Sequence, residues 1–412
     1  MSTTTSAPRA STSRSALLAA ALLAGAARAT VLHVPADIPT IAEAVAAAQS
    51  GDTIRLAAGS YSEQVLISSK IGLTLRGQGK VVLTGGTFVQ AALTIQDSED
   101  IVVDHLRIEG ALGNGVFAAD GGDMTLRRLR VTGSAADGIQ AGEAGGVLID
   151  HCLVEGAGGD GIEISFANQS TVTHCTVKDA AQAGIQFSDV SDSSVEFCHV
   201  SGSGGQGISI GLNDTATSCT ARKNVVLDAG TQGLSAHGPD NLLIDNHVQD
   251  ATFAGIEVQA SSAGTLVQHN VVIGSQTGLR CLSASVVLKD NRATKPTGKG
   301  LVIDGNEDVL LDNRVIHAGE SGYVLVNGFA SGSVLGCKAL HAAEDGFEVA
   351  TDGLLITGNL ATGCGFRGFK VEGTGNLFTG NTAHGNADND LEDQVGGNIY
   401  LDNDFGTVFL SQ

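Results

Sequence analysis

The stretch Val147–Ile164, VLIDHCLVEGAGGDGIEI, is one copy of a unit that recurs along most of the chain. Its fixed point is Gly161, a glycine followed by a short segment in which apolar and polar residues alternate. Twelve glycines share this step at intervals of 22 to 26 residues: Gly115, Gly138, Gly161, Gly184, Gly207, Gly233, Gly255, Gly278, Gly300, Gly322, Gly346 and Gly368. A fixed period in this range predicts a repeat architecture, in which each unit buries its apolar face against its neighbours.

Apolar, mostly β-branched residues stand at fixed distances from each of these glycines, both before and after it. They alternate with polar neighbours, which is the periodicity of strands and not of helices. The pattern predicts three short strands per repeat, stacked in register along the molecule. The helical spacing of ankyrin and tetratricopeptide repeats is absent, and so is the LxxLxLxxN pattern of leucine-rich repeats. We therefore expect an all-β fold, a single-stranded parallel β-helix or solenoid of about 12 regular coils of 22–26 residues.

A further column, nine residues before the glycine, suits a tight inner turn in which side chains of successive coils bond to each other and to the backbone. It holds Leu106, Leu129, Cys152, Cys175, Cys198, Asn224, Asn246, His269, Asn291, Asn313, Cys337 and Asn359. With this column the chain resembles, over roughly residues 30–410, the right-handed parallel β-helix proteins of the pectate-lyase-like (pectin lyase fold) superfamily. The resemblance implies a right-handed coil. It implies no single activity, because that superfamily includes lyases, hydrolases, epimerases, adhesins and copper-assembly factors.

The two ends of the chain depart from the regular period. Residues 1–29 have the pattern of a signal peptide, with arginines before an apolar run and small residues for cleavage at Ala27-Arg28-Ala29, so we expect a secreted protein, extracellular or periplasmic. Residues 30–412 form one β-helix domain: 30–86 hold the N-terminal cap and first coils, 87–375 the regular coils, and 376–412 the C-terminal coil and cap. Thr40 and Glu43 match a capping box, which predicts a short helix over the first coil.

Composition limits the partners. The net charge is −21, and since the first 29 residues hold three arginines and no acid, residues 30–412 carry 20 basic and 44 acidic residues. This balance disfavours nucleic acid and anionic membranes. A uronate polymer would be repelled too, unless a local basic patch or a bound cation overrides the repulsion. No later stretch is apolar enough to insert into a membrane, and we expect a monomer.

The seven cysteines show no disulfide pattern, and those in the inner-turn column are expected to be small buried thiols. His151 and His174 stand next to cysteines, but alternation turns the cysteines inward and the histidines outward. These residues are therefore not expected to converge on a metal, and we assign no metal ligands.

In proteins that this chain resembles, the active cleft lies along the strand that follows the glycine. The outward positions of that strand, two and four residues after it, carry polar side chains in the middle coils. We take His237, Glu257 and Arg280, on consecutive coils, as candidate catalytic residues. The candidate substrate-binding residues are Gln140, Glu163, Gln186, Ser209, Ser235 and Gln259.

The trio fits removal of the proton next to a uronate carboxylate, as in a polysaccharide lyase or epimerase: His237 is the base, and Arg280, or Ca²⁺ on Glu257, stabilises the enolate-like intermediate. Hydrolysis fits less well, because Glu163 and Glu257 are four coils, or roughly 19 Å, apart. The VLIDHCLVEG segment is similar to a strand of pectate lyases, but the proline- and arginine-containing segment of those lyases is absent.

A non-catalytic reading of the sequence stays open. Trp is absent, aromatic residues for sugar stacking are few, and the loops are short, so a surface or periplasmic binding or structural β-helix protein also fits. No cofactor is required, although the acids of the C-terminal segment, such as Asp390 and Asp393, could hold Ca²⁺. The two readings differ in what they predict at Arg280: a deep groove or bound Ca²⁺ for an enzyme, and a flat face otherwise.

Overall fold

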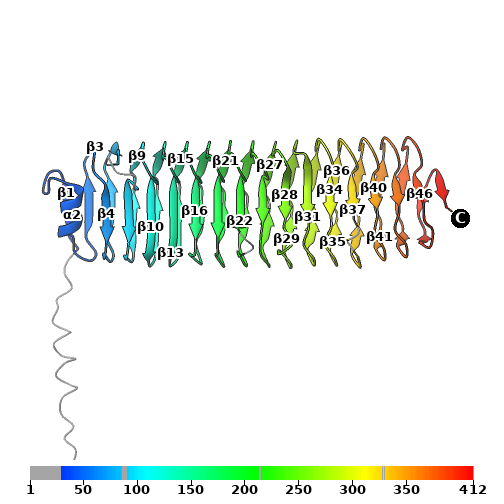
Figure 1. The fold of residues 1–412 in the computed structure, drawn as a ribbon, viewed down its shortest axis with the longest axis horizontal. Helices are drawn as coiled ribbons and strands as arrows, with labels where there is room; N and C mark the ends of the chain where they lie inside the picture. Colours follow the sequence, from blue (N-terminus) through cyan, green and yellow to red (C-terminus); the bar gives the residue numbers. More distant parts are fainter. Residues whose placement is uncertain (1–28, 86–90, 213–214, 327, 329, 412) are drawn as a thin grey trace, which may run out of the picture.

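The computed structural model describes residues 29–85, 91–212, 215–326, 328 and 330–411, so the predicted signal peptide lies outside the described residues, Ala29 excepted. The described chain winds into an elongated solenoid whose coils stack along one axis (Figure 1). Each coil contributes one strand to each of three parallel sheets, which we call A, B and C in the order in which the chain visits them. All the named strands pair in parallel with strands of neighbouring coils, as the repeat predicts.

Sheet A has 17 strands. They are β1 (Val31–Val34), β2 (Thr53–Leu56), β5 (Thr74–Gly77), β8 (Ile101–Asp104), β11 (Met124–Arg127), β14 (Val147–Asp150), β17 (Thr171–Thr173), β20 (Ser194–Glu196), β23 (Thr220–Arg222), β26 (Leu242–Ile244), β29 (Leu266–Gln268), β32 (Val287–Lys289), β35 (Val309–Leu311), β38 (Ser333–Leu335), β41 (Leu355–Thr357), β44 (Leu377–Thr379) and β47 (Ile399–Leu401).

Sheet B has 16 strands. They are β3 (Gly59–Tyr61), β6 (Val81–Leu83), β9 (Arg107–Glu109), β12 (Arg130–Thr132), β15 (Leu153–Glu155), β18 (Thr176–Lys178), β21 (His199–Ser201), β24 (Val225–Leu227), β27 (His247–Gln249), β30 (Val271–Ile273), β33 (Arg292–Thr294), β36 (Arg314–Ile316), β39 (Lys338–Leu340), β42 (Leu360–Thr362), β45 (Thr382–His384) and β48 (Asp404–Phe405).

Sheet C also has 16 strands. They are β4 (Val65–Ser68), β7 (Leu93–Gln96), β10 (Val116–Gly121), β13 (Ile139–Ala144), β16 (Ile162–Ser165), β19 (Ile185–Ser188), β22 (Ile208–Leu212), β25 (Leu234–Ala236), β28 (Ala254–Val258), β31 (Thr277–Cys281), β34 (Leu301–Ile303), β37 (Tyr323–Leu325), β40 (Phe347–Val349), β43 (Phe369–Val371), β46 (Leu391–Asp393) and β49 (Val408–Leu410).

The solenoid has about 16 coils, against about 12 regular coils predicted from the repeated glycine. The difference lies at the two ends, where first coils and a C-terminal coil were expected outside that count. There the sheet C strands begin without the repeated glycine: Gln64 and Ala92 precede β4 and β7, and Asp390 and Thr407 precede β46 and β49. A coil can stack on its neighbour through its inward apolar residues alone. The repeated glycine therefore identifies a coil where it occurs, but a coil can form without it.

The glycine column exists because the coils leave no room for a side chain there. A Cβ added to Gly161 would lie 2.2 Å from Cγ1 of Val177 and 2.5 Å from the carbonyl oxygen of Gly184. Inward residues such as Ile162 and Ile164 are fully buried and form one continuous apolar core along the axis. The same contact that excludes a Cβ therefore packs each coil on the next.

Amide side chains form a hydrogen-bonded ladder at the turn between sheets A and B. Asn224, Asn246, Asn270, Asn291 and Asn313 link through Nδ2–H donors and Oδ1 acceptors, each pair at 3.0 Å. Assigning His269 to this column was wrong, because the coil that ends at Gly278 places the turn one residue later. The side chain of His269 instead lies at the surface, on a residue with a backbone φ of 55°.

The cysteines of the inner-turn column, Cys152, Cys175, Cys198 and Cys337, are buried as predicted. All seven are free and buried, and the Sγ of Cys152 and of Cys175 each lies 3.5 Å from a backbone carbonyl oxygen of the preceding coil.

The predicted capping helix is confirmed as α2 (Ile41–Ala47). Thr40 is its N-cap and accepts the N–H of Glu43 at 3.2 Å, while Ile41, Ala44 and Val45 are buried over the first coil. The carboxylate of Glu63 accepts the N–H groups of Ile41 and Ala42, which satisfies the first turn of the helix. Among the described residues, no helix has the length and apolar character needed to cross a membrane.

Candidate functional site

The candidate residues of sheet C lie on one line, because successive strands pair without a shift at this position. The line is Phe117, Gln140, Glu163, Gln186, Ser209, Ser235, Glu257, Arg280, Val302. Its middle is closed to solvent. Gln186 is 4 % exposed, and the hydroxyls of Ser209 and Ser235 are fully buried with no hydrogen-bond partner among the described residues.

Glu257 is a fixed acceptor. It is 3 % exposed and takes hydrogen bonds from Nε2 of Gln232 at 3.0 Å and from Nε2 of Gln259, while Nη1 of Arg280 lies 3.4 Å from its Oε2. Glu257 and Arg280 are thus brought together as predicted. These contacts occupy the carboxylate, so its role in this arrangement is to orient Arg280.

His237 follows β25 and is half-buried, with its backbone N–H bound to the carbonyl oxygen of Ile210 at 2.7 Å. It is not among the hydrogen-bond partners of Glu257. The structure therefore brings two members of the predicted trio into contact and leaves the histidine on the preceding coil, outside that contact.

The Arg280 side chain lines a surface depression of about 480 Å³ over β28, β31 and β34. Its lining combines different kinds of side chain: Gln232, Phe253, Ala254, Glu257, Gln276, Thr277, Arg280, Lys299 and Val302. Phe253 is 52 % exposed, and the Arg280 side chain is 47 % exposed. The depression therefore presents an aromatic ring, two cations and two amides to solvent in one place. His237 is not part of this lining.

A second group, of carboxylates, lies on the N-terminal coils of sheet C. Nε2 of Gln140 donates to Glu163 at 2.7 Å, and Oε1 of Gln140 accepts from Asn114 at 2.6 Å. Asp137 accepts the N–H of Asp160, and Asp160 accepts the N–H of Ala183, both at 2.7 Å. Sequence reasoning found Gln140 and Glu163 and missed both aspartates. Their position directly before the repeated glycine was the available signal.

Burial raises the pKa values of these carboxyl groups. It raises the pKa of Asp160 to about 6, with repulsion from Asp137 and Glu163 adding to the effect, and it also raises the pKa values of Asp137 and Glu163. The group adjoins a larger hollow of about 940 Å³ that includes Asn114 and Phe117 in its lining. Chemically, the group can hold or release a proton near neutral pH.

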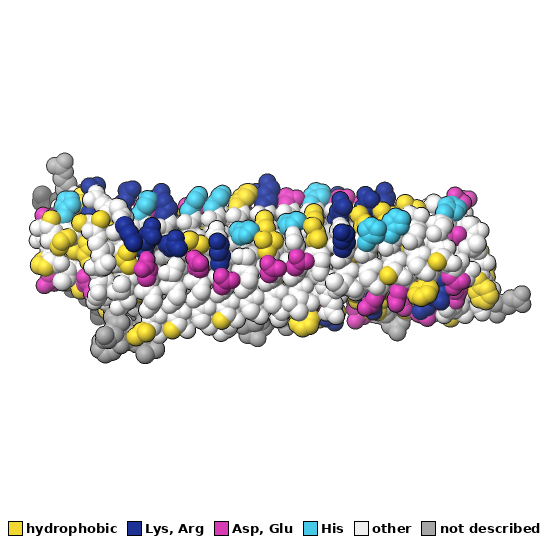
Figure 2. Space-filling view, turned by 90° about the horizontal axis from the view of Figure 1, so that it is seen from above, with side chains coloured by type: hydrophobic (Ala, Val, Ile, Leu, Met, Phe, Trp, Pro, Cys, Tyr) yellow, Lys and Arg dark blue, Asp and Glu magenta, His cyan; other side chains and the backbone are white. Residues whose placement is uncertain are grey.

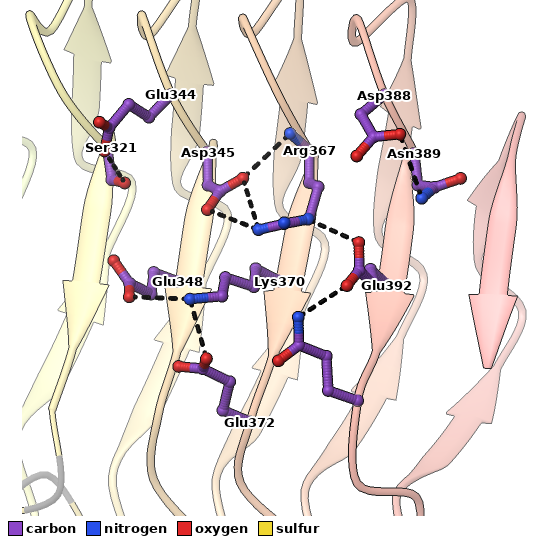
Figure 3. A network of polar contacts seen from close by, with 11 residues as sticks. Ser321, Glu344, Asp345, Glu348, Arg367, Lys370, Glu372, Asp388, Asn389 and Glu392 are labelled. Carbon is purple, nitrogen blue, oxygen red and sulfur yellow. Dashed lines mark hydrogen bonds and ion pairs between the residues drawn. The ribbon is translucent and has the colours of Figure 1, made fainter. Parts of the chain in front are cut away.

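A third group, over β40, β43 and β46, is a charged network (Figure 3). Nε of Arg367 binds Glu392 at 2.6 Å and its Nη1 binds Asp345 at 3.3 Å, while Lys370 binds Glu348 and Glu372 at 3.3 and 2.8 Å. Both cations are thus shared between acids. This network ties the last coils together and leaves no cation open for a ligand.

Among the described residues, one group brings three possible metal ligands together: Asp150, His151 and His174, whose ligand atoms lie within 4.8 Å of one another. The two imidazole rings are stacked with an interplanar angle of 8°. Because the lone pairs of nitrogen lie in the ring plane, two parallel rings cannot both aim at one ion. The group is therefore not preorganised for a metal.

Two of the C-terminal acids considered for Ca²⁺, Asp390 and Asp393, are engaged by protein donors. Asp390 accepts from Asn386 and Thr407, and Asp393 accepts from Tyr400, Asn398 and the backbone of Gly396. These bonds hold the final coil in place.

Solved structures that resemble this one include a pectate lyase, a mannuronan C-5 epimerase module and an α-1,3-glucanase catalytic unit. A pectate lyase aligns with 12% identity and a TM-score of 0.50, over 64% of this chain and 79% of its own. The mannuronan C-5 epimerase A-module of Azotobacter vinelandii aligns with 16% identity and a TM-score of 0.44, over 90% of this chain and 94% of its own. An α-1,3-glucanase catalytic unit from Streptomyces thermodiastaticus aligns with 15% identity and a TM-score of 0.42, over 90% of this chain and 66% of its own.

No curated protein gives a significant match to the sequence. At 12% identity and a TM-score of 0.50, the pectate lyase shows a shared fold and nothing finer. The family model described as the right-handed beta helix region matches residues 91–242 and 232–388, which is most of the chain. By this match, the protein belongs to the right-handed β-helix family.

Proposed function

We propose that the protein recognises an acidic polysaccharide in the depression around Arg280. The observation that carries the proposal is the lining, in which the exposed ring of Phe253 lies in one hollow with Arg280, Lys299 and two glutamine amides. An aromatic face packs against the apolar face of a sugar ring, amides bond to hydroxyls, and a guanidinium binds a carboxylate in two parallel hydrogen bonds.

The fixed contacts of Arg280 support this role. Glu257 holds the guanidinium from one side at 3.4 Å, and Gln232 and Gln259 hold Glu257 in turn. An arginine that is already oriented loses less side-chain entropy when it binds an anion. The pectate lyase of the same fold gives the reason to begin with uronate polymers. We further propose that residues 1–29 direct export, which would bring the protein to such polymers.

The first test is binding of short oligogalacturonates and oligomannuronates by calorimetry. Arg280→Gln is expected to weaken binding about 10- to 100-fold, the cost of losing a hydrogen bond to a charged group, and Phe253→Ala should weaken it about 10-fold. Phe166→Ala and Lys178→Gln serve as matched controls, because both side chains are exposed and lie away from the depression. Equal losses in the controls, or no binding by the parent protein, would refute the proposal.

Turnover is a separate part of the proposal. Elimination next to a uronate carboxylate would need a base as well as Arg280. We propose His237, which follows a strand two coils before that of Arg280 and lies outside the lining of the depression. Lyase activity is followed by the absorbance of the unsaturated product, with and without Ca²⁺. The expected result is a signal that His237→Ala abolishes while oligosaccharide binding persists; proton exchange at the sugar C5 distinguishes an epimerase. Binding without either reaction would establish the non-catalytic alternative.

A further inference from the structure

Basic side chains concentrate on one edge of this acidic protein, the corner between sheets A and B. We define the A/B corner by three positions in each coil: the last outward residue of the sheet A strand, the turn residue that follows, and the first residue of the sheet B strand. Of the 20 Lys and Arg residues after residue 28, twelve lie here: Arg55, Arg76, Arg107, Arg127, Arg128, Arg130, Arg222, Lys223, Lys289, Arg292, Arg314 and Lys338. Figure 2 shows Lys, Arg and His side chains in rows along the length of the solenoid.

Over the same coils, these three positions hold half as many acidic residues as basic ones: Asp104, Asp150, Glu196, Asp245, Asp290 and Asp312. Six histidines add to the corner: His105, His151, His174, His199, His247 and His269. The corner is therefore locally positive on a chain whose net charge is −21. This is the local basic patch that an acidic polymer would need to overcome the overall repulsion.

The N-terminal part of the corner is built around one buried carboxylate. Asp104 is fully buried, and its oxygens lie 2.7 Å from Arg128, 3.3 Å from Arg127 and 3.5 Å from Arg76. Burial alone would raise the pKa of Asp104, but the hydrogen bonds from Arg128 and the nearby positive charges hold it below its usual value. The ionised carboxylate thus fixes three guanidinium groups side by side while each stays between 39% and 48% exposed.

Other cations of the corner have no acidic partner. Among the described residues, neither Arg55 nor Arg107 takes part in an ion pair. Arg55, Arg76 and His105 line a hollow of about 440 Å³ together with the backbone of Gly77–Gly79. Arg76 and His105 also contact Asp104, whereas Arg55 keeps its guanidinium donors available to an anion bound in this hollow.

The corner continues into the C-terminal half. Arg292, Arg314 and Lys338 are paired in register on three successive strands of sheet B, all exposed, and the described structure gives none of them an ion pair. Successive strands are about 4.8 Å apart, so the corner from Arg55 to Lys338 extends over roughly 58 Å. Its cations recur along a line parallel to the solenoid axis.

We propose that the A/B corner binds a linear polyanionic polysaccharide that lies along the solenoid axis. A single extended chain suits a narrow line of cations that runs parallel to the solenoid axis. Nucleic acid suits it less, because single strands need aromatic platforms for base stacking, and Phe197, the one ring of Phe, Tyr or Trp among the corner's described residues, is already stacked on His174 at 5.1 Å. The corner is separate from the depression around Arg280, so this proposal stands independently of the first.

The test uses the purified full-length protein and biolayer interferometry with immobilised dextran sulfate, polygalacturonate, neutral dextran and oligo(dT). We expect dextran sulfate and polygalacturonate to bind with an affinity that falls as salt rises, and neutral dextran not to bind. The pairs Arg55→Gln/Arg107→Gln and Arg314→Gln/Lys338→Gln should each weaken binding about 5- to 50-fold and reduce the dependence on salt. Arg314 and Lys338 are exposed, Arg55 and Arg107 are half-buried, and none of the four has an ion pair in the part of the chain that the structure describes, so the variants should fold.

Lys178→Gln/Lys295→Gln is the matched control, since it removes two exposed cations from the far ends of sheet B strands and should change the affinity less than 2-fold. An equal loss in this control would show that only net charge matters and would overturn the proposal. Tighter binding of oligo(dT) than of dextran sulfate would reassign the corner to nucleic acid. Arg280→Gln separates the two proposals, because it should weaken oligogalacturonate binding without changing the affinity for dextran sulfate.

Discussion

Replacing Asp308 by asparagine is expected to raise the melting temperature of the protein at pH 8. Asp308 is fully buried, where Oδ1 accepts the N–H of Val286 at 2.7 Å and Sγ of Cys281 lies 3.4 Å from Oδ2. It stands where Asn241 and Asn376 stand in other coils, and each of those amides also donates to a carbonyl oxygen of the preceding coil. An asparagine at 308 would keep the acceptor, supply that donor and remove a buried charge.

The pH dependence follows from the raised pKa of Asp308. Burial raises it to about 6, above the value near 3.9 in an unfolded chain, so the folded state prefers the protonated acid. The parent protein therefore loses stability as pH rises from about 4 to 6 and stays lower above that range. The variant escapes this loss, which amounts to about 1–3 kcal/mol.

Thermal unfolding followed by circular dichroism at pH 4.5 and pH 8 checks the prediction. The variant should gain more over the parent at pH 8 than at pH 4.5. Asp304→Asn is the matched control, because Asp304 precedes Asp308 by four residues but is exposed, and it should leave both melting temperatures unchanged. An equal gain at both pH values would mean that the charge of Asp308 is not the cause.

Asn246→Leu is expected to destabilise the middle coils by about 3–5 kcal/mol. Asn246 is 1 % exposed; its Oδ1 accepts the backbone N–H and Nδ2 of Asn224, both at 3.0 Å, and its Nδ2 donates to the carbonyl oxygen of Ala221 and to Asn270. Leucine has similar size and none of these bonds, so several buried polar groups lose their partner at once, each at a cost of about 1–3 kcal/mol.

Urea unfolding measures this effect. The parent and Gln249→Leu, a substitution at the surface of the same coil, should unfold within about 0.5 kcal/mol of each other. A loss below about 1 kcal/mol for Asn246→Leu would show that the ladder has little net value. The leucines at 106 and 129 in the same column do not argue against the prediction, because no asparagine stands next to them along the ladder.

The fold could be predicted from the sequence because every regular coil meets the same steric requirement at the same position. Gly161 shows the requirement at atomic scale, since a Cβ there would lie 2.2 Å from Val177. Where the requirement is relaxed, the prediction was less exact. The end coils lack the glycine and were left out of the count of regular coils. The coil before Gly278 places its turn one residue later, so His269 was assigned to the position that Asn270 occupies.

The candidate site was predictable only in part. Alternation and period placed Glu257 and Arg280 next to each other, and the register Glu257↔Arg280 confirms this. They could not show that Gln232, from the turn before β25, would reach Glu257, nor that Phe253 would stay exposed beside Arg280. These features depend on side-chain conformation at the turns, where the repeat does not constrain the residue.

The matching register of neighbouring coils such as those of β16 and β19 has a consequence for how such a protein can change over evolutionary time. Duplicating or deleting one complete coil of 23 residues, such as Gly161 to Ala183, would join strands whose inward and outward positions already match. The length of a binding edge can therefore grow or shrink in steps of about 4.8 Å while the chemistry at each step is kept. The number of coils in such a solenoid can therefore change to match the length of its ligand.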